Sequence, residues 1–203
     1  MSAGTVIASG RKPVLPWLMD DRFRWREERS EPVQRCGIFD LFRARRTSAG
    51  GRSADFYLLR APAWVSVVPV LEGRPGAERL LMVRQYRQGV ERTTVEFPAG
   101  LVEPGEDPGE AAVRELAEET GYRASSLRRI GYVAPNPAFM DNWCTTYCAE
   151  GLSAGVQRLD PLEDLEVLEV GLEELRAGIG SGELINSMTV VALHWYLRYR
   201  GTI

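Results

Sequence analysis

The sequence predicts an α/β (α+β) chain in which helices flank a mixed sheet and antiparallel strands precede it. Segments rich in β-branched and aromatic residues recur from residue 22 to residue 170, as is typical of strands. One segment between them carries both start and stop signals of a helix, and two further helical segments close the chain. Strands that bury a face need a covering layer, so these elements favour helices packed on a sheet.

The composition is that of a globular protein. The chain has 203 residues, of which 44% are hydrophobic and 26% charged, which suits one domain with an N-terminal extension. No apolar run approaches the roughly 20 residues that span a bilayer, and the opening MSAGTVIASGRKPV lacks the apolar core of a secretory signal. The three cysteines include CTTYC without a companion cluster, so we expect reduced thiols, no zinc site, no membrane partner and a cytoplasmic location.

The net charge of −3 is unevenly distributed. Residues 1–60 carry 12 basic residues against 7 acidic ones, whereas the rest of the chain is acidic. A basic segment can bind nucleic acid or another phosphate. Because the arginines are dispersed and no recognised module surrounds them, we expect no nucleic-acid partner. A solvated surface, or packing against the acidic part, is the alternative interpretation.

Alternation and turn signals define the strands. We expect strands at 22–27, 35–46, 56–60, 64–71, 79–87, 93–100, 127–134, 142–150 and 165–170. The glycine- and serine-rich stretch TSAGGRSAD is a predicted break between two of them, and EGRPGAE at 72–78 is a predicted hairpin loop.

The best-defined helix begins at Pro108. Asp107 is its expected N-cap, with Glu110 three residues later, and Gly121 is its expected stop. Further helices are expected at 171–179 and 187–200. The last contains His194, the one histidine of the chain, which we interpret as a packed or surface residue and not a catalytic one.

The helix in GLVEPGEDPGEAAVRELAEETGY has an acidic face. At about 100° per residue, Glu115, Glu118 and Glu119 fall on one side, opposite an apolar stripe. Like charges one turn apart repel by about 0.2–0.5 kcal/mol per pair. Arg114 is expected to pair with Glu110, which leaves Glu115 and Glu119 without a cation. An external Mg²⁺ or Mn²⁺ would stabilise such a face; a solvated acidic surface is the alternative.

The same stretch follows the pattern G-x5-E-x7-R-E-U-x-E-E-x-G-U, where U is a bulky apolar residue, from Gly100 to Tyr122. It resembles the Nudix box at all nine specified positions, although Tyr122 is aromatic where an aliphatic residue is usual. LLMVRQYRQG, VEFPAGLVEPGE and PLEDLEVLEV resemble the ADP-ribose pyrophosphatase branch of that family, as does Pro137, 16 residues after Gly121.

This resemblance implies an αβα sandwich with a mixed central sheet, and an enzyme that hydrolyses a nucleoside diphosphate linked to another group. The leading expectation is Mg²⁺-dependent hydrolysis of ADP-ribose to AMP and ribose 5-phosphate. The alternative is the same chemistry on other nucleoside diphosphate sugars, such as GDP-mannose. A non-catalytic nucleotide-sugar-binding regulator is disfavoured because the box keeps all of its acids.

The resemblance also implies roles for individual residues. The expected metal ligands are the carbonyl of Ala99 and the side chains of Glu115, Glu118, Glu119 and Glu163. Within the box, Gly100 permits a tight turn, Glu106 braces the loop or the metal shell, Arg114 orients a glutamate and Gly121 ends the helix.

Substrate contacts and the general base are assigned less directly. Arg87 is expected to hold the diphosphate, since its planar fork suits phosphate, with a surface salt bridge as the alternative. Pro137 is the second expected substrate-binding residue. Glu163 and Glu166 are candidates for the general base, and Glu118 and Glu115 remain open for that role because Pro161 and Leu162 stand where relatives often carry a glutamate.

The domain expectation follows from the extent of the resemblance. Residues 1–55 form an N-terminal extension with strands that is expected to mediate a homodimer, and residues 56–203 form the Nudix domain. In this branch the aromatic residue that stacks on the base often comes from the N-terminal strand, sometimes from the partner subunit, and the sequence does not identify it.

Overall fold

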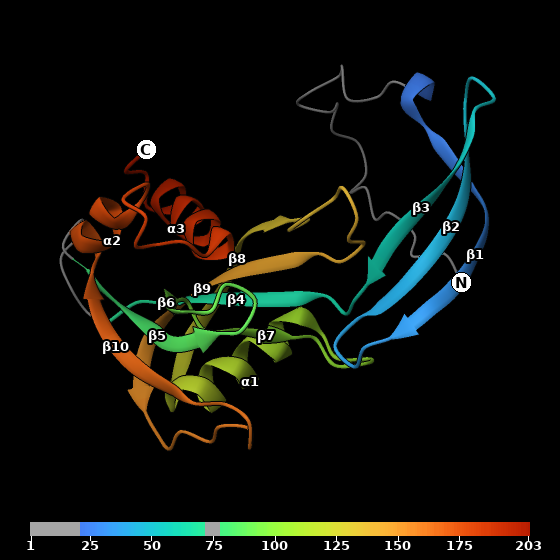
Figure 1. The fold of residues 1–203 in the computed structure, drawn as a ribbon. Helices are drawn as coiled ribbons and strands as arrows, with labels where there is room; N and C mark the ends of the chain where they lie inside the picture. The colour runs from blue at the N-terminus through green and yellow to red at the C-terminus, as the bar shows by residue number, and fades with distance from the viewer. Residues whose placement is uncertain (1–20, 72–77) are drawn as a thin grey trace.

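The computed structural model describes residues 21–71 and 78–203, so most of the expected hairpin loop at 72–78 lies outside the described residues. The chain begins with a short 3₁₀ helix, η2 (Asp21–Phe23), and three strands: β1 (Trp25–Arg35), β2 (Asp40–Ser48) and β3 (Ser53–Arg60). These strands form an antiparallel sheet in the order β1-β2-β3, which extends to one side of the remaining elements (Figure 1).

The prediction of a single strand at residues 35–46 is wrong. Residues 36–39 instead form the turn of a hairpin between β1 and β2, in which the amide of Cys36 donates to the carbonyl of Phe39 at 3.0 Å. Gly37 adopts a φ of 81° there, a left-handed conformation that glycine accepts without steric cost. Gly37 is the local signal of this reversal, whereas the apolar residues that follow it favoured a continuous strand.

Several arginines of β2 and β3 pair with acids on other strands of this sheet. Arg46 and Arg60 both contact Glu27, at 3.1 and 3.3 Å, and Arg45 contacts Asp55 at 3.2 Å. Part of the positive charge of the N-terminal segment is therefore compensated within its own sheet.

Two further sheets form the centre of the protein. A mixed sheet has the order β7-β4-β9-β8, with β4 and β9 parallel, and an antiparallel sheet has the order β10-β5-β6. Their strands are β4 (Trp64–Pro69), β5 (Arg79–Arg87), β6 (Arg92–Glu96), β7 (Ala99–Leu101), β8 (Tyr122–Val133), β9 (Cys144–Ala154) and β10 (Leu165–Gly171). The segment expected as one strand at 93–100 is divided between the two sheets around Pro98, which has no amide hydrogen for a ladder.

Helices cover both faces of the mixed sheet, so the expected αβα sandwich is confirmed (Figure 1). Helix α1 (Pro108–Thr120) packs through Leu116 on a cluster with Val65 and Val67 of β4. On the opposite face, Val68 belongs to a larger cluster with α2 (Leu172–Gly178) and α3 (Ser187–Arg200). Within the described ranges, no helix has the length and apolarity needed to cross a membrane.

Candidate active site

A cavity of about 640 Å³ lies between α1, the mixed sheet and the 36–39 turn of the N-terminal sheet. Its charged wall is made of Arg87, Glu96, Glu103, Arg114, Glu115, Glu118, Asp160 and Glu163. Its apolar wall includes Ile38, Phe39, Trp64, Met140 and Met188. The cavity therefore combines acidic and basic side chains with apolar ones, which suits a ligand that joins an anionic group to a ring.

Local sequence signals place α1 at this cavity. Asp107 accepts a hydrogen bond from the amide of Gly109 at 2.7 Å, with Pro108 at the first helical position, so the expected N-cap is confirmed. Gly121 ends the helix in a left-handed conformation with a φ of 74°, also as expected. These two ends set where the acidic face of the helix begins and stops.

Gly100 stands directly against the acidic face. A Cβ at this position would overlap the carboxylate of Glu115. Glycine is therefore required because β7 passes so close to α1, and this close approach brings the strand backbone beside the carboxylates.

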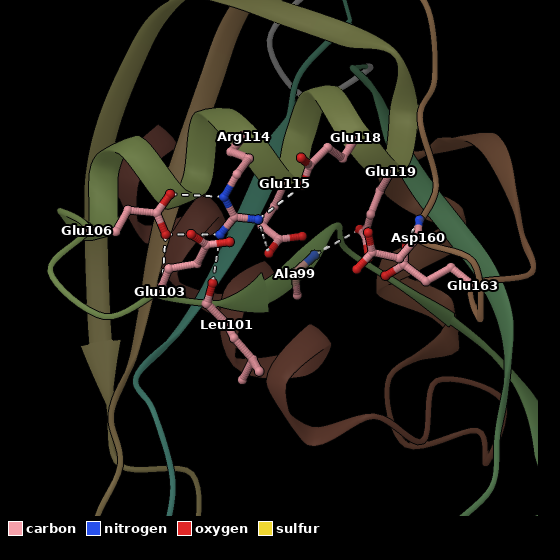
Figure 2. Close-up of polar contacts among 10 residues, drawn as sticks. All are labelled: Ala99, Leu101, Glu103, Glu106, Arg114, Glu115, Glu118, Glu119, Asp160 and Glu163. Carbon is pink, nitrogen blue, oxygen red and sulfur yellow. Dashed lines mark hydrogen bonds and ion pairs between the residues drawn. The ribbon is translucent and has the colours of Figure 1, made fainter. Parts of the chain in front are cut away.

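Arg114 is the centre of a hydrogen-bond network on α1 (Figure 2). Its guanidinium donates to both carboxylate oxygens of Glu106, at 2.9 and 3.0 Å, to Glu115 at 2.8 Å and to Glu118 at 3.0 Å. A further bond reaches the carbonyl of Leu101 at 2.9 Å. The expected pairing with Glu110 is replaced by these contacts, because the folded loop brings Glu106 within reach. Glu115 consequently has a cationic neighbour that periodicity alone did not indicate.

Glu106 connects this network to the loop that precedes the helix. Its carboxylate also accepts from the amide of Glu103 at 2.9 Å. The hydrogen bonds from Arg114 hold the pKa of Glu106 below its usual value. In this position Glu106 braces the loop.

Glu115 and Glu119 are buried, so the alternative of a solvated acidic surface does not hold for them. Glu119 accepts from the amide of Ala99 at 3.0 Å. Burial raises the pKa of Glu119 to about 8, and the nearby charges of Glu115 and Glu163 add to the rise. Burial also raises the pKa of Glu115, although Arg114 opposes this effect. Both carboxylates would gain from a further cation.

Glu163 approaches this group from the connection between β9 and β10. It forms a tight turn with Asp160, whose amide donates to the Glu163 carboxylate at 3.0 Å (Figure 2). Glu166, in contrast, lies on β10 and pairs with the exposed Arg84. Of the two acids considered for this region, only Glu163 lines the cavity.

Arg87 and Glu96 form a bidentate ion pair at the edge of the cavity. The Nε and Nη2 atoms of Arg87 donate to the two oxygens of Glu96 at 3.0 and 2.7 Å, and Thr94 donates to Glu96 at 2.6 Å. Burial alone would raise the pKa of Glu96, but the bonds from Arg87 and Thr94 bring it below its usual value. The sequence analysis did not single out Glu96; the available signal was a charged residue between the apolar Val95 and Phe97, at the end of β6.

Pro137 lies in a different place from the other expected site residues. It lines a smaller cavity of about 220 Å³ with Trp25, Phe56 and Met140, between the N-terminal sheet and the segment before β9. Met140 lines both cavities, so the two are neighbours. The segment is joined to β3 by a bond of 2.8 Å from the amide of Leu59 to the carbonyl of Phe139.

The remaining titratable candidates are not part of the charged wall, although Cys144 does line the cavity. Cys36, Cys144 and Cys148 are free, and burial raises the pKa of Cys144 and of Cys148 to about 12, which makes both thiols unreactive. His194 is exposed on α3 and contacts Trp195.

A divalent cation fits the donor chemistry of this site. Across residues 21–71 and 78–203, no three histidine, cysteine, aspartate or glutamate side chains are gathered closely enough to hold a metal ion. Glu115 and Glu118 face Arg114, and Glu119 binds the amide of Ala99. These groups nevertheless supply hard oxygen donors, and the burial of two of them makes their negative charge costly without a cation.

Known proteins resemble this chain in sequence. It is 34% identical over 160 residues to the ADP-ribose pyrophosphatase of Bacillus subtilis (strain 168), a match that covers 78% of this chain and 84% of that protein. It is also 34% identical over 147 residues to the methanol dehydrogenase activator of Bacillus methanolicus, covering 71% of this chain and 77% of that protein.

The fold resembles that of a solved protein. A crystal structure of an ADP compounds hydrolase superposes with a TM-score of 0.76 at 24% identity, covering 89% of this chain and 97% of that one. The sequence model of the NUDIX domain family matches residues 62–185 of this chain. With the box, its capped helix and this matched span in agreement, the chain belongs to the Nudix hydrolase family.

Proposed function

We propose that this protein hydrolyses ADP-ribose to AMP and ribose 5-phosphate. The observation that carries the proposal is the single cavity that is lined both by Arg87, Glu115, Glu118 and Glu163 and by apolar side chains. Similarity to the Bacillus subtilis protein named ADP-ribose pyrophosphatase supports an adenosine diphosphate compound as substrate. It favours ADP-ribose over GDP-mannose and other nucleoside diphosphate sugars.

Nudix hydrolases generally use divalent metal ions, and we propose Mg²⁺ or Mn²⁺ here. The residues that would hold the ion are Glu115, Glu118, Glu119 and Glu163, with the carbonyl of Ala99. Once bound, a divalent ion neutralises the diphosphate and lowers the pKa of a bound water. Without it, the carboxylates would repel the substrate.

Arg87 is proposed to bind the diphosphate. Its Nε and one Nη2 hydrogen are engaged by Glu96, which leaves the Nη1 group and the second Nη2 hydrogen for a phosphate oxygen. The Arg87 side chain is 44% exposed while that of Glu96 is 4% exposed. A buried carboxylate therefore fixes an accessible guanidinium, which reduces the entropy lost when the substrate binds.

Glu163 is proposed as the group that accepts a proton from the attacking water, with Glu118 and Glu115 as the remaining candidates. Glu163 lines the cavity, whereas Glu115 and Glu118 are engaged by Arg114. A carboxylate that is already bound to a guanidinium is a weaker base. Pro137, in the neighbouring cavity, is proposed to shape the substrate site through the shared wall at Met140.

We also propose that the protein is a cytoplasmic homodimer whose contact is the N-terminal sheet. Strand β1 is an edge strand in which most residues are exposed, and such edges invite pairing with another chain. The division into residues 1–55 and 56–203 stays a prediction; the N-terminal sheet itself continues to Arg60. Chromatography with light scattering tests the dimer.

A substrate panel tests the activity. ADP-ribose, other ADP-sugars, GDP-mannose and UDP-glucose are incubated with Mg²⁺, and the products are identified by chromatography. We expect AMP and ribose 5-phosphate, with the highest kcat/KM for ADP-ribose and no turnover in excess chelator. A higher kcat/KM for GDP-mannose would overturn the substrate, and absence of turnover on the whole panel would favour a binding protein.

A further inference from the structure

The connection between β9 and β10, residues 155–164, is attached to the C-terminal end of α1. The side-chain amide of Gln157 donates to the carbonyl of Glu119 at 2.6 Å, and the backbone amide of Arg158 donates to the carbonyl of Glu118 at 3.0 Å. The last carbonyls of a helix have no partner inside the helix. This connection therefore satisfies two of them, on the residues whose side chains face the site.

Two glycines allow the backbones to approach closely here. A Cβ on Gly121 would lie 2.8 Å from the backbone nitrogen of Gln157, and a Cβ on Gly155 would lie 2.9 Å from the carbonyl oxygen of Gly121. Gly121 thus has a second role besides ending the helix, because it admits the connection that follows β9.

The attachment is close in sequence to the acidic turn. The amide of Glu163 donates to the carbonyl of Asp160 at 2.9 Å, and β10 begins at Leu165, where it pairs with β5. Residues 159–164 are consequently held between the helix end on one side and the sheet on the other. Figure 2 shows Asp160 and Glu163 on the side of the site where Glu119 lies.

Apolar packing does little to hold this connection. Val156 is 77% exposed and Leu162 is 99% exposed. Where apolar contacts are few, local opening is easy and hydrogen bonds become the main restraint.

We propose that Gln157 is a positioning residue, whose side-chain amide fixes the 155–164 connection to α1 so that Glu163 stands beside Glu115 and Glu119. The inference rests on the proposed function, in which Glu163 acts on the diphosphate. Gln157 itself touches neither substrate nor metal ion and acts through Glu163.

Kinetics of single variants test the role. Gln157→Ala removes the donor, and Val156→Ala alters the adjacent exposed side chain as a matched control. With ADP-ribose and Mg²⁺, we expect Gln157→Ala to lower kcat about 2- to 10-fold, the range that loss of one hydrogen bond allows, with little change in KM. Val156→Ala keeps the wild-type kcat and KM.

A double variant separates positioning from general stability. If Gln157 acts through Glu163, the variant Gln157→Ala/Glu163→Gln is no slower than Glu163→Gln alone, because the positioned group is already lost. Hydrogen exchange gives a readout independent of activity: the amides of residues 159, 160 and 162–164 exchange faster in Gln157→Ala than in Val156→Ala, while those of α3 are unchanged.

The kinetic results distinguish failure of the role of Gln157 from failure of the role of Glu163. A normal kcat in Gln157→Ala together with a low kcat in Glu163→Gln overturns the positioning role and leaves the proposed function standing. Additive losses in the double variant, or unchanged exchange at 159–164, also overturn it. A normal kcat in Glu163→Gln overturns the role of Glu163 and, with it, the inference that rests on it.

Discussion

Arg87 of β5 reaches along the neighbouring antiparallel strand β6 to Glu96 and shares two hydrogen bonds with it, of 3.0 and 2.7 Å, although the register places Val83 opposite Glu96 and Arg92 opposite Arg87. The carboxylate is buried and the guanidinium reaches the cavity. The alternative interpretation of Arg87, a salt bridge on the surface, describes only half of this arrangement, since the pair forms part of the cavity wall.

Arg87→Lys should raise the KM for ADP-ribose about 10-fold or more. Lysine keeps the charge but loses the planar fork, so it cannot bind Glu96 through two bonds and a phosphate at the same time. Arg84→Lys is the control, because Arg84 lies on the same strand but pairs with Glu166 outside the cavity. Equal KM values for the two variants would contradict a role in substrate binding.

Glu96→Gln should lower stability as well as substrate affinity. The neutral amide fills the same space but leaves Arg87 without its counterion, at a cost of about 1–2 kcal/mol in the free energy of unfolding. The pKa of Glu96 is lower in the folded protein than its usual value of 4.5. The contribution of the Glu96 carboxylate to the free energy of unfolding is therefore present above pH 4.5 and is lost as the pH falls through the folded-state pKa. Urea unfolding of wild type and Glu96→Gln at pH 7 and pH 3.5 checks this expectation. An equal difference in the free energy of unfolding between the two proteins at both pH values would contradict it.

Glu119→Gln should abolish most activity while the fold stays intact. In the metal-free protein the pKa of Glu119 is about 8, above its usual value of 4.5. Between these pH values the folded protein therefore keeps a proton on Glu119 that the unfolded chain releases. Stability therefore falls as the pH rises from about 4.5 to about 8. With chelator at pH 8 the variant should melt at a higher temperature than wild type, and near pH 5 the difference should disappear. A lower melting temperature of the variant at pH 8 would refute the argument.

Gly100→Ala should reduce kcat at least 10-fold, because the added Cβ overlaps the Glu115 carboxylate and forces it to move. Gly89→Ala is the matched control, since a Cβ at Gly89 meets nothing within 4 Å. Steady-state kinetics and melting temperatures of both variants decide the matter. Normal kcat in Gly100→Ala would show that the position of Glu115 is not critical.

Glu163→Gln should lower kcat about 10²- to 10⁴-fold, the usual contribution of general-base assistance, with a much smaller effect on KM. Glu166→Gln should turn over almost normally, because Glu166 pairs with Arg84 away from the cavity. Near-normal rates in both variants would move the base to Glu115 or Glu118 on α1.

Local sequence determined the elements whose signals lie within one or two turns of chain. The N-cap Asp107, the stop at Gly121 and the acidic face of α1 are all present in the structure, because capping and helical periodicity depend on neighbouring residues. The resemblance to the Nudix box indicated the family for the same reason, since its nine specified positions lie within one loop and one helix.

Tertiary structure decided the contacts that join distant segments. The partners of Arg114, the pairing of Arg87 with Glu96, the cavity that Pro137 lines and the attachment of Gln157 to α1 all depend on strand register and on how loops close. Register is set by packing and turn geometry across the whole sheet, so no local pattern contains it. The sequence therefore predicted which carboxylates form the site, and only the folded chain fixed which cations and loops hold them in place.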